Sequence, residues 1–279
     1  MHSKFLLAGV MGWPVAHSRS PLIHNHWIRE HGLNAAYGHF AVDAARVGEA
    51  LRGLSALGMA GCNITIPHKV EAMRHVDWLH PQAQRIGAIN CVVVQEDGQL
   101  HGYNHDGYGF LESLREARPD WRADAGPVVV LGAGGASRAI LVALIDAGAP
   151  EIRLLNRTRE TAQALADEFG PVIQVHDWAA RHAVLAGAEL LVQTTNLGMS
   201  GEAPLEIDLA ALPTPAVVAD IIYTPLETAL LAQARARGNP TVNGLGMLLH
   251  QARPAFASWF GVAPAVTPAL WQHVLASFD

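Results

Sequence analysis

Short runs of apolar residues alternate along this chain with longer stretches in which apolar positions recur every three or four residues. The short runs have the length of β-strands, and the longer stretches have the periodicity of amphipathic helices. Regular alternation of the two is typical of an α/β fold with parallel sheets. The expected strands are residues 5–12, 35–42, 60–65, 127–130, 151–158, 171–175, 188–196 and 216–222.

Local signals mark where several elements begin or turn. Ser20 is expected to cap a helix that starts at Pro21, because serine suits the cap and proline the first helical position. Asp43 precedes a second helix, and Asp97-Gly98 predicts the turn of a β-hairpin. The expected helices include residues 21–32, 44–58, 244–261 and 268–278.

The stretch 117–126 is rich in proline, glycine and charge, which marks a domain boundary. A length of 279 residues also favours two domains. We predict one domain formed by residues 1–117, to which the final helices at 246–279 return, and a second formed by 118–245. The chain would then cross between the domains twice.

Composition limits the class of protein. Charged residues make up 16% of the chain and mean hydropathy is +0.17, which is typical of a well-buried globular protein. The net charge of −6 predicts no basic face for nucleic acid or an anionic membrane. Cys62 and Cys91 lie in apolar strands, so we expect buried thiols in a cytoplasmic protein. The fifteen histidines include no set with metal-ligand spacing, so we expect no metal.

A glycine cluster follows the apolar run at 127–130 and precedes a helical pattern, which is the context of a dinucleotide-binding loop. Gly132 suits the tight turn and Gly134 allows the backbone to approach a pyrophosphate. Ser137 replaces the usual third small residue. The next strand ends in Asn156, Arg157, Thr158 and Arg159 rather than in the acid that binds an NAD ribose, so NADP is favoured.

The segment "CNITIPHKV", residues 62–70, leaves two interpretations open for Lys69. Pro67 suits a helix start, so the lysine could simply begin a surface helix. Alternatively, a buried strand could carry it to the mouth of a cleft, where acid/base groups often lie.

The whole chain resembles the shikimate dehydrogenase family. The segments "GWPVAHSRSPLIHN", "NITIPHK", "GAIN", "GYNHDG", "GAGGASRA", "NRT", "DIIYTPLET" and "GLGMLLHQ" are similar to family motifs and occur in the family's order. The resemblance implies a substrate-binding first domain and a Rossmann-like NADP-binding second domain. It also implies reversible, NADP-linked reduction of 3-dehydroshikimate to shikimate, in the biosynthesis of aromatic amino acids through chorismate.

Site residues are carried over by position in these motifs. The resemblance implies that Lys69 and Asp106 form the catalytic, proton-transferring pair and that two serines bind the substrate carboxylate. Asn104 matches a further polar group near the ring hydroxyls. The implied substrate-binding residues are Ser18, Ser20, Thr65, Lys69, Asn90, Asp106, Tyr223 and Gln251. The implied cofactor-binding residues are Gly132, Ala133, Gly134, Gly135, Ala136, Asn156, Arg157, Thr158, Arg159, Thr195, Gly244 and Met247.

Departures from the family pattern leave alternatives open. His105 stands where threonine is usual, and Thr161 replaces a basic residue, for which Arg159 could substitute. A quinate/shikimate dehydrogenase or a divergent paralogue acting on another cyclic hydroxy acid is one alternative. A non-catalytic NADP-binding sensor is another, although retention of both Lys69 and Asp106 argues against it. We expect a monomer or a homodimer.

Overall fold

The computed structural model describes residues 5–278 and divides the chain into two compact units. The first contains the residues up to Asp106 together with those from Leu249 onward, and the second contains Gly107–Leu248. The chain leaves the first unit where helix α4 (Asp106–Ala117) begins and returns within helix α8 (Gly244–Phe260). The boundary predicted after residue 117 falls at the end of α4, whereas contacts join all but the first residue of that helix to the second unit.

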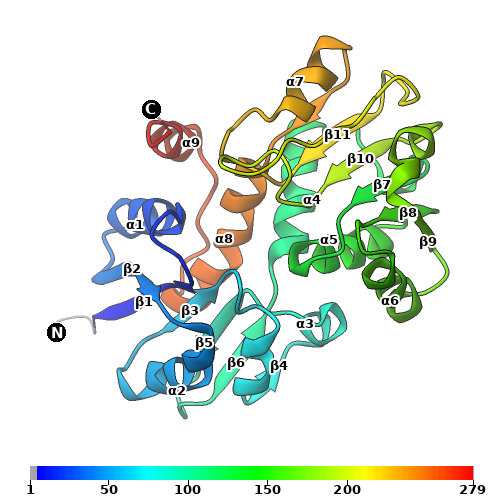
Figure 1. Cartoon of the computed structure of the whole chain (residues 1–279). Helices are drawn as coiled ribbons and strands as arrows, with labels where there is room; N and C mark the ends of the chain where they lie inside the picture. Colours follow the sequence, from blue (N-terminus) through cyan, green and yellow to red (C-terminus); the bar gives the residue numbers. More distant parts are fainter. Residues whose placement is uncertain (1–4, 279) are drawn as a thin grey trace. The chain divides into compact units, whose positions relative to one another are not determined.

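The first unit is built on a mixed six-stranded sheet in the order β2-β1-β3-β5-β6-β4 (Figure 1). β1 lies parallel to both of its neighbours, whereas β5 lies antiparallel to β3 and β6. The strands are β1 (Leu6–Gly12), β2 (Ala35–Ala41), β3 (Gly61–Ile64), β4 (Trp78–Leu79), β5 (Cys91–Val94) and β6 (Leu100–Tyr103). The helices are α1 (Ser20–Glu30), α2 (Val47–Ala56), α3 (Pro81–Ile86) and α9 (Pro268–Leu275), with 3-10 turns at Ala44–Arg46 and Glu71–His75.

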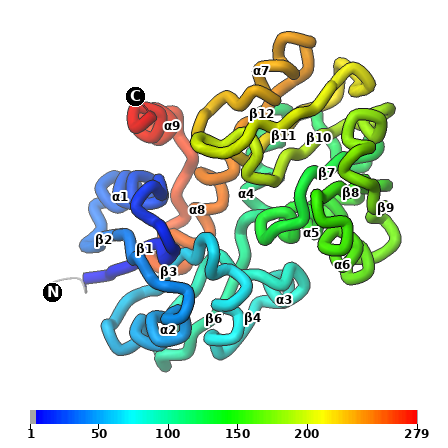
Figure 2. Tube along the Cα trace, viewed as in Figure 1, coloured from blue at the N-terminus to red at the C-terminus, as the bar shows by residue number. Residues whose placement is uncertain are grey.

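The end of the chain packs on its beginning within this unit. Helices α1 and α9 lie side by side (Figure 2). The Trp27 indole donates a hydrogen bond to the carbonyl of Ala265 at 3.0 Å, and the Arg19 guanidinium donates to the carbonyl of Ser277 at 3.0 Å. The predicted pair of final helices is confirmed as α8 and α9, and these hydrogen bonds join the segments on either side of α9 to Trp27 of α1 and to Arg19 just before it.

The second unit holds an all-parallel sheet in the order β12-β11-β10-β7-β8-β9. Strand order reverses between β7 and β10, which is the doubly wound topology that places ligands at this switch point. The predicted α/β class with a Rossmann-like unit is confirmed. The strands are β7 (Val128–Leu131), β8 (Ile152–Leu155), β9 (Ile173–His176), β10 (Leu190–Gln193), β11 (Val217–Asp220) and β12 (Thr241–Val242). The helices besides α4 and α8 are α5 (Gly135–Asp146), α6 (Arg159–Phe169) and α7 (Ala229–Ala236), with 3-10 turns at Ala123–Ala125 and Trp178–Leu185.

Strand β7 shows why the strands of this sheet can be predicted from the sequence. Val128 and Val130 belong to one apolar cluster, and Val129 and Leu131 belong to another. Since both faces of the strand are covered, every residue must be apolar, which produces a continuous run rather than an alternating pattern.

One predicted helix start is wrong. The N-cap of α1 is Arg19, and Ser20 is already the first helical residue; its backbone N–H donates to the Ser18 hydroxyl at 3.3 Å. No helix begins at Pro67, which excludes the first of the two interpretations of Lys69. Lys69 lies in a turn after β3, and only a 3-10 turn follows it.

Other local predictions are confirmed. β5 and β6 form the hairpin around Asp97-Gly98, with Gly98 at φ +86°. Cys62 and Cys91 are buried, free thiols on neighbouring strands. No helix in the described part of the chain has the length and apolar character needed to cross a bilayer.

His24 lies inside the first unit among aromatic rings. It is 0% exposed and stacks on Tyr37 with ring centroids 4.2 Å apart and an interplanar angle of 8°. Burial lowers the pKa of His24 from 6.5 to about 3, because the imidazolium would lose its hydration. The folded protein therefore holds this ring neutral.

Folding stability should consequently depend on pH through His24. Its contribution is fully present above pH 6.5 and is lost as pH falls from 6.5 towards 3, by a total on the order of 4 kcal/mol, because only the unfolded chain takes up the proton. The replacement His24→Phe keeps an aromatic ring and should remove this part of the pH dependence in urea-unfolding experiments. His17→Phe, at an exposed position, should retain it. Equal slopes for the parent and His24→Phe would contradict the assignment.

Candidate active site

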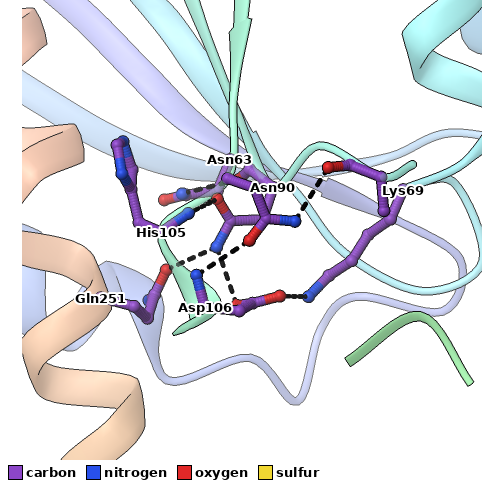
Figure 3. A network of polar contacts seen from close by, with 8 residues as sticks. Asn63, Lys69, Asn90, His105, Asp106 and Gln251 are labelled. Atoms are coloured by element: carbon purple, nitrogen blue, oxygen red, sulfur yellow. Dashed lines mark hydrogen bonds and ion pairs between the residues drawn. The ribbon is translucent and has the colours of Figure 1, made fainter. Parts of the chain in front are cut away.

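Lys69 and Asp106 meet at the ends of two strands of the first sheet. Lys69 follows β3 by five residues, and its carbonyl accepts from the Ile89 N–H at 2.9 Å. Asp106 lies three residues after the end of β6, as the first residue of α4. Its N–H donates to the Asn104 side-chain oxygen at 3.0 Å. The Lys69 Nζ lies 2.5 Å from Asp106 Oδ2, with side chains 17% and 6% exposed (Figure 3). The structure thus brings together the predicted pair across 37 positions of sequence.

Asn90 fixes the other oxygen of that carboxylate. Its Nδ2 donates to Asp106 Oδ1 at 2.8 Å and to Gln251 Oε1 at 3.2 Å, while its Oδ1 accepts the His105 N–H at 2.9 Å (Figure 3). Both amide hydrogens and the amide oxygen of Asn90 are therefore engaged. The carboxylate is therefore held in one orientation towards the ammonium, and within residues 5–278 two of the three Lys69 N–H bonds remain for another partner.

Asn63 is a member of this network that the sequence reasoning missed. Its Nδ2 donates to the Asn90 carbonyl at 3.0 Å, and its Oδ1 accepts the Tyr37 hydroxyl at 2.6 Å. The available signal was a polar residue inside the buried strand β3, where it is 5% exposed. Buried amides require partners, so such a residue points to a network.

The two predicted serines also lie together. The Ser18 hydroxyl donates to that of Ser20 at 3.2 Å, at the start of α1, and His39 Nε2 is 3.0 Å from the Ser18 carbonyl. Thr65 directly follows β3 in the segment that leads to Lys69, and its N–H donates to the Met11 carbonyl at 2.9 Å. These are neutral groups able to bind an oxygen-rich ligand.

The glycine loop of the second unit has the shape that a phosphate cradle requires. Gly132 adopts φ +109°, and a side chain there would meet the Thr194 hydroxyl at 2.5 Å, so only glycine fits. Gly134 and Gly135, at the start of α5, have open space where side chains would stand. Ser137 is buried, and its hydroxyl donates to the Gly132 carbonyl at 2.6 Å, which ties the loop down. These residues fit a dinucleotide pyrophosphate at a helix N-terminus.

The polar side chains after β8 differ in whether another residue of the protein already binds them. Asn156 donates to the Thr158 carbonyl at 2.9 Å, while Arg159 makes an ion pair with Asp177 at 2.7 Å. Arg157 is exposed and has no ion pair within residues 5–278. A free guanidinium at this strand end fits a ribose 2′-phosphate, whereas Arg159 is already held by a carboxylate.

The remaining predicted cofactor residues lie around the switch point and in the core. Thr195 donates its N–H to Gln193 Oε1 at 3.0 Å, and its hydroxyl accepts from Gln193 Nε2 at 2.9 Å. The Gly244 N–H donates to the Ile222 carbonyl at 3.0 Å. Met247 is 9% exposed and packs in an apolar cluster, while Tyr223 lies in the loop between β11 and α7.

His105 turns its ring away from the Lys69–Asp106 pair (Figure 3). The ring lies 6.0 Å from that of Tyr103, and its Nε2 is buried without a hydrogen bond among the described residues. Burial lowers the pKa of His105 from 6.5 to about 4, and the opposing influence of Asp106 is smaller. No group of three potential metal-ligating side chains occurs within residues 5–278.

The chain is similar to known proteins over nearly its full length. Residues 10–92 match the family model of the shikimate dehydrogenase substrate binding domain, and residues 117–199 match that of shikimate/quinate 5-dehydrogenase. Shikimate dehydrogenase (NADP(+)) of Paramagnetospirillum magneticum is 54% identical over 99% of this chain and 100% of its own length. Shikimate 5-dehydrogenase from Thermus thermophilus, solved in complex with NADP(H) and shikimate, superposes with a TM-score of 0.87 at 35% identity, covering 98% of this chain and 100% of that one. Quinate dehydrogenase from Corynebacterium glutamicum, in complex with NAD, gives 0.90 at 30% identity, covering 98% and 100%.

The replacement His105→Thr tests the position of this ring. Because the ring faces away from the polar network and stays neutral above about pH 5, the pH profile of turnover between 6 and 8 should not change. The parent should lose folding stability as pH falls from 6.5 towards 4, because His105 binds a proton in the unfolded chain but not in the folded one. In His105→Thr this loss should be smaller. A turnover profile that shifts between pH 6 and 8 would show that the ring acts on the reaction.

Proposed function

Because the chain belongs to the shikimate dehydrogenase family, we propose that it catalyses the reversible, NADP-linked reduction of 3-dehydroshikimate to shikimate. The observation that carries this proposal beyond family membership is the Lys69–Asp106 contact, in which both carboxylate oxygens are engaged and the ammonium keeps free donors. Retention of this pair argues against a non-catalytic NADP-binding protein.

Reduction of a ketone requires a hydride for carbon and a proton for oxygen. The reduced nicotinamide, when bound, supplies the hydride. Lys69 Nζ donates the proton to the developing alkoxide, and in the oxidising direction it accepts that proton from the alcohol. Asp106 is the group that aims the ammonium and stabilises its charge, and Asn90 keeps the carboxylate in place.

Substrate binding is assigned to neutral groups of the first unit. The adjacent hydroxyls of Ser18 and Ser20 bind the ring carboxylate, and Thr65 and Gln251 bind ring hydroxyls. Asn90 uses all its hydrogen-bonding capacity within the protein, so we assign it chiefly to orienting Asp106 and Gln251. Tyr223 remains a substrate assignment by its place in the family motif.

Cofactor selection is assigned to the end of β8. Arg157 pairs with the 2′-phosphate of NADP, while Arg159 remains with Asp177 and contributes less. The Gly132–Gly135 loop holds the pyrophosphate through backbone N–H groups. We further propose a cytoplasmic location, which the two buried free thiols support.

The replacement Lys69→Ala should lower kcat by about a hundredfold or more, because general acid catalysis contributes about that factor. The dissociation constant of NADP, measured by fluorescence titration, should stay unchanged, since the glycine loop is intact. Asp106→Asn should also lower kcat, because the ammonium loses its orienting charge. Near-normal turnover by Lys69→Ala, with shikimate and NADP, would remove this residue from the mechanism.

The replacement Arg157→Ala should raise the dissociation constant of NADP by about tenfold or more and leave that of NAD almost unchanged, because only NADP carries the 2′-phosphate. Adding Asn156→Asp to Arg157→Ala should shift the preference further from NADP towards NAD. Arg159→Ala is the matched control, and it should alter NADP binding by less than Arg157→Ala because Asp177 already occupies that guanidinium. Equal losses from both arginine variants would mean that Arg159 leaves Asp177 to bind the phosphate.

A further inference from the structure

His68 is a buried imidazole that no role assigned above uses. It directly precedes Lys69 in the turn after β3, residues 65–72, which we call the lysine turn, and it is only 1% exposed. Its Nε2 lies 2.7 Å from the carbonyl oxygen of Val42. Because a carbonyl oxygen can only accept, this ring nitrogen carries a hydrogen and donates it to Val42.

Val42 belongs to a firmly paired part of the first sheet. It follows the last residue of β2, and its N–H donates to the carbonyl of Gly12, at the end of β1, at 3.1 Å. β1 and β2 pair along their whole length. A side chain on Gly12 would collide with the Thr65 methyl group, so the lysine turn passes directly against the end of β1. The His68 hydrogen bond therefore joins this turn to a fixed point of the sheet.

The backbone of the lysine turn is held on both sides of the lysine. The His68 N–H donates to the Thr65 carbonyl at 2.9 Å, and the Ala72 N–H donates to the His68 carbonyl at 2.8 Å. The Lys69 carbonyl accepts the Ile89 N–H at 2.9 Å. These bonds fix the shape of the turn, and the His68 side chain fixes the part next to Lys69 against the sheet.

We propose that His68 is a positioning residue for Lys69: its hydrogen bond to Val42 fixes where the lysine side chain begins, and so where the ammonium lies when it donates the proton. This inference rests on the proposed function, because Lys69 is assigned as the proton donor there. A lysine stem has four flexible carbons, so the side chain alone does not place its ammonium. Asp106 orients the end of that stem (Figure 3), and His68 fixes its origin.

Two other roles for His68 predict different results. Packing alone would require only a ring of this size, so phenylalanine would serve as well as histidine, and glutamine would serve worse. A proton relay through the ring would require a group that titrates near neutral pH, so phenylalanine and glutamine would both fail. Positioning requires an N–H donor at the place of Nε2, which the amide of glutamine supplies and phenylalanine does not.

The first test compares kcat and KM for shikimate, at saturating NADP, in the parent, His68→Phe and His68→Gln. His68→Phe should lower kcat about tenfold, because proton transfer depends on the placement of the donor, and should change KM less than about twofold. His68→Gln should keep kcat within about threefold of the parent, because it restores the hydrogen bond. His75→Phe is the matched control: it removes a ring contact to Glu71 at 3.1 Å on the following 3-10 turn and should leave both constants unchanged.

A second comparison asks whether the effect passes through the lysine. In the Lys69→Ala background, His68→Phe should lower kcat by less than about twofold, because no ammonium remains to be positioned. The proposal would be overturned by an equal fall of kcat in both backgrounds, or by a kcat in His68→Gln no higher than that in His68→Phe.

Should His68→Phe fold poorly, His68→Asn takes its place, because its amide is one carbon shorter and does not reach Val42. It should lower kcat as described for His68→Phe, and a parental kcat would contradict the positioning role. Hydrogen exchange needs no activity: the Ile89 N–H, which donates to the Lys69 carbonyl, should exchange faster in His68→Phe or His68→Asn than in His68→Gln. A parent inactive on shikimate would refute the proposed function, while equal exchange in these variants would refute the positioning role.

Discussion

The fixed Asp106 carboxylate is the constraint on which the candidate active site depends. One oxygen faces Lys69 and the other accepts from Asn90, while the backbone N–H of Asp106 is held by Asn104. A buried carboxylate needs such partners, because it has lost its hydration and only these hydrogen bonds and the ion pair offset that loss. The same contacts that make the charge tolerable also remove its freedom to rotate, and this fixes where the ammonium points.

Sheet topology explains how these groups come together. β3 and β6 are separated in the first sheet only by β5, and Asn90 immediately precedes that central strand. The carbonyl of Asn90 accepts from the Ile64 N–H and its N–H donates to the Tyr103 carbonyl, both at 2.9 Å. Backbone pairing therefore places the Asn90 amide between the segments that carry Lys69 and Asp106. In the second unit, the reversal of strand order at β7 and β10 similarly brings Gly132 against Thr194.

Sequence predicts the features that local pattern determines and misses those set by distant partners. β7 was predictable because both its faces are buried, and the hairpin because Asp97-Gly98 suits its turn. The short strands β4 and β12, with two residues each, carry too little pattern to be seen. The contact between Lys69 and Asp106 required resemblance to a family, since no periodicity links residues so far apart.

Two details show what residue type alone leaves open. Ser20 is a common helix cap, but Arg19 is the N-cap of α1 and Ser20 is its first residue. Arg159 is of a residue type that binds phosphate, but Asp177, eighteen positions later, pairs with its guanidinium, so its assignment to the cofactor stays a prediction. Composition identifies which groups could act, whereas tertiary contacts decide which are free to do so.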